Sequence, residues 1–145
     1  MKHNQGGFTL LELIIVMILS LLILGLVTVY FANLLSSVKL QAAGREFSAT
    51  LRQARTLAKI NGQPQAVIIN LDSKEYGLED RGPRKISSSV DLKIIDPAEG
   101  EIRSGQYRLV FEPNWGNPGL TFQLSDKKKV LSIFLDPLSG ATVIK

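Results

Sequence analysis

The side chains that carry most enzyme chemistry are nearly absent from this sequence. Its 145 residues include no cysteine and a single histidine, His3. We expect His3 to lie in an N-terminal segment that is removed, and a remaining chain with neither His nor Cys lacks the usual nucleophile–base pairs and nearly all zinc sites. We therefore expect no catalytic residue, no metal site and no cofactor, and a function that does not depend on catalysis.

One carboxylate, Glu12, stands in an unusual place. It is the only ionisable side chain between Phe8 and Val38, in a run that is mostly Leu, Ile, Val and Ala. A carboxylate within a membrane span costs about 2.5–3.5 kcal/mol at the helix centre, so it normally has a purpose and a partner. The alternative interpretation is that Glu12 lies near the interface and reaches water.

The apolar run around Glu12 is long enough to cross a membrane. About 20 apolar residues cover a ~30 Å hydrocarbon core, and Lys2 ahead of the run favours a cytoplasmic N-terminus with the rest of the chain outside. A removable secretory signal is the competing interpretation. The apolar region of such a signal would cover only about 7–15 residues and end at a cleavage site of small residues, of the Ala-x-Ala type. Residues 32–37 match such a cleavage site poorly.

A helical pattern continues beyond the apolar run. Apolar side chains recur at spacings of three and four, and Asn61-Gly62 followed by Pro64 supplies the stop. Three basic residues fall seven apart on another face, which is most often a solvated face and otherwise a contact with an anionic partner. The apolar stripe comprises Leu40, Ala43, Phe47, Leu51, Ala54 and Ala58, and the basic residues are Arg45, Arg52 and Lys59.

Beyond Pro64 the pattern changes to short alternating runs separated by turn residues, which predicts antiparallel β-structure. The sequence thus predicts an α+β fold, with a long N-terminal helix, membrane-spanning in its first half, packed on a small antiparallel sheet or sandwich. The expected segments are a short polar N-terminus (1–7), a transmembrane helix (8–37), an amphipathic helix that continues from it (38–62) and an antiparallel β domain (63–145). Expected strands cover residues 65–71, 76–78, 90–95, 107–111, 120–124, 130–135 and 141–144, with turns at 72–74, 126–128 and 137–140.

The N-terminus resembles the leader of type IV pilins and type II secretion pseudopilins. The resemblance rests on residues 6–12, Gly-Gly-Phe-Thr-Leu-Leu-Glu, followed by Leu-Ile-Ile-Val. It implies a leader of residues 1–7, cleaved after Gly7 by a prepilin peptidase that then methylates Phe8. It also implies a bacterial inner-membrane protein whose N-terminal helix contacts lipid and other pseudopilins, major and minor. The family's conserved glutamate falls on Glu12.

Cleavage before Phe8 would create an amine one helical turn from Glu12, on the same face. In a filament the carboxylate could instead meet the amine of a neighbouring subunit. A mispaired register would leave a buried charge uncompensated, so Glu12 would set the register of assembly more than add stability. Family pilins often carry a proline partway along this helix, and this span has none.

The rest of the chain resembles the GspH minor pseudopilins and the related FimT minor pilins, in residues 51–58, 111–116 and 135–140. The resemblance implies a subunit of the periplasmic pseudopilus that exports folded proteins across the outer membrane. The alternative is a FimT-like minor pilin that binds DNA for uptake. A membrane-anchored hydrolase that uses carboxylates alone is a third hypothesis.

Several side chains of the C-terminal part are candidates for binding. Trp115 could be a partner contact or a lid over the sheet edge, and Lys127, Lys128 and Lys129 could contact DNA or an acidic partner. Asp96, Glu99 and Glu101 could gather a calcium ion, although the C-terminal calcium loop of the major pseudopilins is not evident.

Without Lys2, 16 basic and 13 acidic residues leave a charge of +3, so nucleic-acid binding is not expected from charge.

Overall fold

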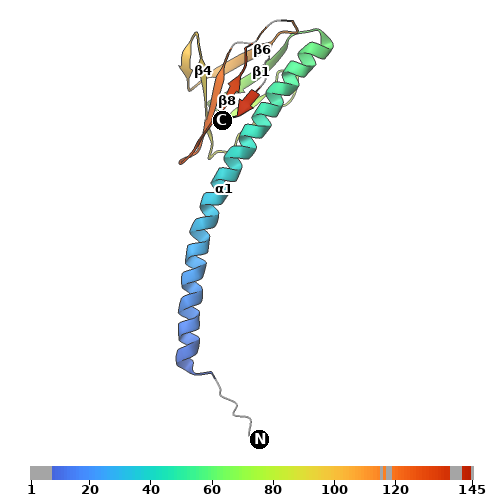
Figure 1. Cartoon of the computed structure of the whole chain (residues 1–145). Helices are drawn as coiled ribbons and strands as arrows, with labels where there is room; N and C mark the ends of the chain where they lie inside the picture. The colour runs from blue at the N-terminus through green and yellow to red at the C-terminus, as the bar shows by residue number, and fades with distance from the viewer. Residues whose placement is uncertain (1–7, 115, 117–118, 138–141, 145) are drawn as a thin grey trace. The chain divides into compact units, whose positions relative to one another are not determined.

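The computed structural model describes residues 8–114, 116, 119–137 and 142–144, and of residues 28–36 it describes only the backbone. Within these residues one helix precedes nine strands, which confirms the expected α+β class (Figure 1). The chain divides into two units, residues 1–35 and 36–145, which are described separately. The elements are α1 (Leu10–Asn61), β1 (Gln65–Asn70), β2 (Glu75–Leu78), β3 (Arg84–Lys85), β4 (Asp91–Asp96), β5 (Gly100–Ile102), β6 (Gln106–Phe111), β7 (Thr121–Ser125), β8 (Val130–Leu135) and β9 (Thr142–Ile144).

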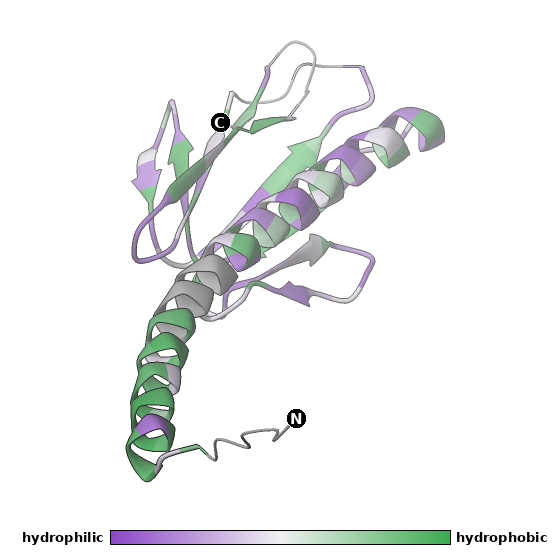
Figure 2. Ribbon diagram, turned by 60° about the horizontal axis from the view of Figure 1, so that its bottom comes forward, coloured by the Kyte–Doolittle hydropathy of each residue, from purple (hydrophilic) through white to green (hydrophobic). Residues whose placement is uncertain are grey.

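The first unit contains the apolar half of α1. The segment Leu10–Val27 is long and apolar enough to cross a membrane, and none of it is buried in the chain. Figure 2 shows this half apolar around the helix, with one hydrophilic turn near its start. The hydroxyl of Ser20 donates to the carbonyl of Val16 at 2.8 Å, so it needs no partner outside the helix. A helix that is apolar all round has to bury its surface in lipid or against other helices.

The second unit contains the remainder of α1 and all the strands. The stripe expected from the spacing is confirmed, since Leu40, Phe47, Leu51, Ala54 and Ala58 are buried and Ala43 packs against them. The helix ends at Asn61, and Gly62 follows with a φ of 62°. Glycine adopts this left-handed conformation without a steric penalty, which makes it the preferred residue after a helix.

The strands form two antiparallel sheets. The first has the order β3-β2-β1-β6 and the second the order β5-β4-β7-β8-β9. The expected strands correspond to seven of these, and the turn after Asn70 and the turn after Ser125 join paired strands as expected. The sequence analysis missed β3 and β5, which are edge strands of two and three residues. Segments this short show no alternation of apolar and polar residues.

Phe47 joins α1 to both sheets. Its ring lies 5.0 Å from the ring of Tyr76 in β2 and 5.0 Å from that of Phe122 in β7, edge-on in both cases. One hydrophobic core therefore connects the helix with both sheets. Near this core, Gly44 lets β8 approach closely, because a Cβ at this position would collide with the Cδ2 methyl group of Leu131.

Candidate functional site

The first turn of α1 is fixed by a cap. The side-chain oxygen of Thr9 accepts a hydrogen bond from the backbone N–H of Glu12 at 3.2 Å, and the carbonyl of Thr9 accepts one from Leu13. This satisfies one of the amide groups that a helix start leaves unpaired. Thr9 and Glu12 have the spacing of a capping box, Thr-x-x-Glu. The sequence analysis missed Thr9, although that spacing was a signal for it.

The cap places the carboxylate of Glu12 in the first helical turn, where the helix dipole favours negative charge. Thr9 bonds the backbone of Glu12, so the carboxylate stays available for another partner. Phe8 immediately precedes the cap and is 82% exposed. Gly7 lies outside the described residues. Cleavage, methylation of Phe8 and pairing of its amine with Glu12 therefore stay predictions.

The turn that carries the three candidate lysines is built on Asp126. Its side chain accepts hydrogen bonds from the backbone N–H groups of Lys128 and Lys129, at 2.8 and 2.7 Å. The ammonium group of Lys129 donates to the hydroxyl of Ser37 in α1 at 3.1 Å. The structure therefore confirms the turn but assigns Lys129 a contact within the chain. Lys127 and Lys128 are exposed.

The carboxylates considered for calcium make other contacts. Asp96 accepts from the backbone N–H of Ala98 at 2.8 Å and from the hydroxyl of Tyr107 at 2.7 Å. Glu101 pairs with Lys93 at 2.7 Å and with Arg103 at 3.0 Å. Over the described part of the chain, no three His, Cys, Asp or Glu side chains gather in a way that could hold a metal ion. The calcium interpretation is therefore dropped. Trp115 lies outside the described residues.

The contact between Asp96 and Tyr107 connects the two sheets, because Asp96 ends β4 and Tyr107 belongs to β6. The backbone N–H of Ala98 and the hydroxyl of Tyr107 hold the pKa of Asp96 below its ordinary value. Burial and the hydrogen bond to Asp96 raise the pKa of Tyr107. Both groups thus keep their neutral-pH charge states, ionised for Asp96 and protonated for Tyr107. We interpret the pair as a fixed connection between the sheets.

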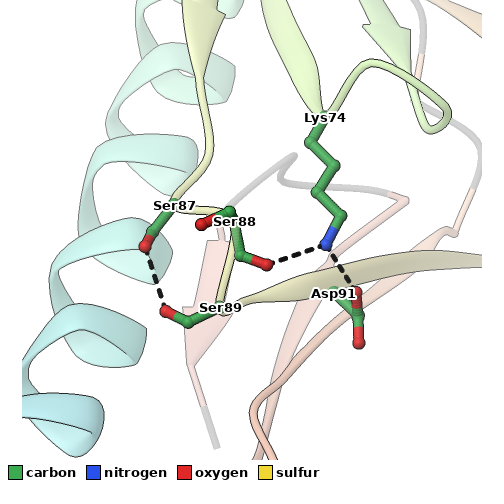
Figure 3. Close-up of polar contacts among 5 residues, drawn as sticks. All are labelled: Lys74, Ser87, Ser88, Ser89 and Asp91. Carbon is green, nitrogen blue, oxygen red and sulfur yellow. Dashed lines mark hydrogen bonds and ion pairs between the residues drawn. The ribbon is translucent and has the colours of Figure 1, made fainter.

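A second connection involves Lys74, in the turn between β1 and β2 (Figure 3). Its ammonium group lies 2.7 Å from a carboxylate oxygen of Asp91 at the start of β4, and 3.1 Å from the carbonyl of Ser88. Lys74 adopts a φ of 55°, which is uncommon for a residue with a side chain. By contacting Ser88 and Asp91, Lys74 holds in place the segment that leads from the first sheet into β4 of the second. The sequence analysis read Lys74 only as a turn residue.

Residues 2–28 match the family model described as the prokaryotic N-terminal methylation motif. Comparison of the chain with curated proteins finds no match, and comparison with solved structures finds none either.

The matched residues include Gly7, Phe8, the Thr9 cap, Glu12 and the whole apolar segment Leu10–Val27. The motif is a type IV pilin-like prepilin signal, and it supports the pilin and pseudopilin family, whose members are subunits of a pilus or pseudopilus. Together with the exposed apolar helix, it fits a single-pass anchor in the inner membrane. Such a protein is expected to be processed by a prepilin peptidase and to assemble with other pilin-like subunits.

Proposed function

We propose that this chain is a minor pseudopilin of the GspH type, a structural subunit of the type II secretion pseudopilus. One observation carries the filament role. The mostly apolar helical segment Leu10–Val27, 18 residues long and not buried by the described part of the chain, lies within a prepilin motif and contains a single carboxylate. No described residue buries this segment, so lipid holds it before assembly and neighbouring subunits cover it afterwards. The second unit, residues 36–145, which we call the body, lies in the periplasm.

The role is mechanical, and an assembly ATPase elsewhere supplies the energy. The chain contributes shape through its body and register through Glu12. A role without catalysis is part of this proposal. Arg108 lowers the pKa of Glu79, the backbone of Ala98 lowers that of Asp96, and Lys93 lowers that of Glu101, whereas a general acid at neutral pH needs a raised pKa.

The second candidate is a FimT-like minor pilin that binds DNA. The exposed side chains of Lys127 and Lys128 at the tip of the β7–β8 hairpin favour it. Contacts of this kind would involve phosphates and carry no base specificity. The mild net charge argues for weak binding, so this remains the alternative.

Intact-mass measurement of the membrane-extracted protein tests the first step. The mature chain should begin at Phe8 and carry one added methyl group, and a bulky residue at Gly7 should leave the precursor uncut. An unprocessed wild-type N-terminus would contradict the filament proposal.

Deleting the gene in its own cells then separates the two systems. Loss of protein secretion supports the pseudopilin, whereas loss of DNA uptake with normal secretion supports the FimT-like alternative.

A further inference from the structure

The cations of the second unit differ in whether they have a carboxylate partner. The five ion pairs among the described residues involve Lys74, Lys85, Lys93, Arg103 and Arg108, and all of these lie in the strands and loops. The basic residues on the body half of α1 have no ion pair with any described residue: Lys39, Arg45, Arg52, Arg55 and Lys59. These five cations lie along one helix, whereas the other described cations without an ion pair, such as Arg81, Arg84 and Lys127, are spread over strands and turns.

Three of these residues, Arg45, Arg52 and Lys59, form a line that we call the basic ridge. All three are exposed. Seven residues of α-helix rise about 10.5 Å and fall about 20° short of two full turns, so the three side chains follow one flank of α1. The only acidic residue between Ser36 and Asn61 is Glu46, which lies about 100° from Arg45 around the helix. The ridge therefore carries a single sign of charge.

Arg52 is held in place from the neighbouring sheet. One terminal nitrogen of its guanidinium group donates to the hydroxyl of Thr142 in β9 at 3.2 Å. Its other N–H groups have no partner among the described residues, and a guanidinium group with a free edge binds a carboxylate through two parallel hydrogen bonds. On β9, Ile144 lies on the same face as Thr142 and is 40% exposed, so apolar surface is also available beside Arg52.

We propose that the basic ridge is a docking surface for an acidic helix of a different pilin-like subunit. The inference rests on the proposed filament function, which brings helices of neighbouring subunits together. A seven-residue repeat is the spacing at which two nearly parallel helices stay in contact, and charged residues beside such a contact select the partner. The partner would carry carboxylates seven residues apart. Its apolar side chains would cover Ile144, which lies on the same face of β9 as Thr142, and a phosphate backbone cannot do this.

A second copy of this chain does not satisfy the charge requirement. The acidic residues of α1 are Glu12 and Glu46, which are 34 positions apart, so a copy cannot offer three carboxylates at intervals of seven. The ridge thus favours association between unlike subunits. It would let this chain distinguish an acidic neighbour from itself, because electrostatic complementarity steers encounter and disfavours wrong partners.

The test measures binding to the full mature chain in detergent micelles. The probe is a synthetic helical peptide with one glutamate per heptad, and its control is a peptide of the same composition with the glutamates distributed around the helix. The ridge variant is Arg45→Gln, Arg52→Gln and Lys59→Gln. The matched control variant is Lys39→Gln, Arg81→Gln and Arg84→Gln, which removes three exposed charges that lie off the ridge.

We expect the heptad peptide to bind the wild type more tightly than its control peptide, and binding to weaken as salt screens the charges. The ridge variant should bind about tenfold more weakly, the sum expected of three exposed ion pairs, and the control variant should change little. Changing the three ridge residues to glutamate should transfer binding to a peptide with lysine at the heptad positions.

An equal loss of peptide affinity in the ridge variant and the control variant would mean that only net charge matters, and it would overturn the proposal. Equal binding of the two peptides to the wild type, or no binding of either, would also overturn it. Tighter binding of a short DNA duplex through the ridge would overturn it in favour of nucleic acid. The filament function is tested separately by the mass of the processed N-terminus, which does not depend on the ridge.

Discussion

The two halves of α1 have the same backbone conformation but bury their side chains in opposite ways. From Leu10 to Val27 the helix is apolar on every side and none of it is buried in the chain. From Leu40 to Ala58 it buries one stripe in the core and leaves polar side chains exposed. In the proposed function, lipid and neighbouring subunits cover the first half, whereas the second is stabilised by its contacts in the core. Mutations should accordingly affect assembly in one half and folding in the other.

The largest effect on folding is expected for Phe47→Ala. This change removes the ring that contacts both sheets and should lower the free energy of unfolding of the body by about 3–5 kcal/mol. Urea unfolding of the detergent-solubilised chain, followed by fluorescence of the only tryptophan, measures it. Membrane insertion and processing should stay normal. If the precursor accumulated uncut instead, the two halves would not be independent.

The connection between the sheets should have a smaller effect. Tyr107→Phe removes a hydrogen bond to an ionised carboxylate and should cost about 1–2 kcal/mol at neutral pH. The same change in an Asp96→Asn background should cost clearly less, since its partner is no longer charged. Equal costs in the two backgrounds would mean that the tyrosine acts through packing alone.

The same contact predicts a pH dependence. The pKa of Asp96 is lower in the folded chain than its ordinary value of 3.8, which applies in the unfolded chain. The contribution of Asp96 to the free energy of unfolding is therefore fully present above about pH 3.8 and is lost as the pH falls through the folded pKa. Tyr107→Phe should bring the folded pKa closer to the ordinary value. The loss of stability between pH 7 and pH 3 should then be smaller in the variant than in the wild type. Urea midpoints at the two pH values measure this difference.

The same substitution at two glycines compares the two halves of α1 directly. Gly44→Ala brings a methyl group against Leu131. Overpacking costs about 1–3 kcal/mol, and alanine regains about 0.5–1 kcal/mol of helix propensity, so a net loss of about 1 kcal/mol is expected. Leu131→Ala should relieve the clash. At Gly25 an added Cβ meets nothing within 4 Å, so Gly25→Ala should leave the urea midpoint of the body unchanged.

The helix and most strands could be predicted because their signals are local. The spacing of Leu40, Phe47 and Leu51 defined the buried stripe, and Asn61-Gly62 defined the end of the helix. The contacts of Lys74 with Asp91 and of Asp96 with Tyr107 could not be predicted in this way. They join residues 17 and 11 positions apart that only the folded sheets bring together.

At the N-terminus, the motif and Glu12 were recognisable from the sequence, and the structure added the Thr9 cap. The direction of the chain across the membrane stays a prediction from Lys2. The sequence does not define the partner of Glu12, because the amine could belong to the same chain or to a neighbouring subunit. Assembly therefore has to be measured with the other subunits present.

The most direct test of the register role compares Glu12→Leu with Glu46→Leu, which removes the other carboxylate of the same helix. Glu12→Leu removes a charge from the membrane segment, so insertion should be unharmed or improved. Cleavage depends mainly on Gly7 and should also be preserved. The measurement is co-purification of each cleaved variant with partner pseudopilins, alongside a secretion assay. Our account predicts that the Glu12→Leu protein is cleaved and membrane-resident but absent from the filament complex, while Glu46→Leu is incorporated. Normal incorporation and secretion with Glu12→Leu would contradict it.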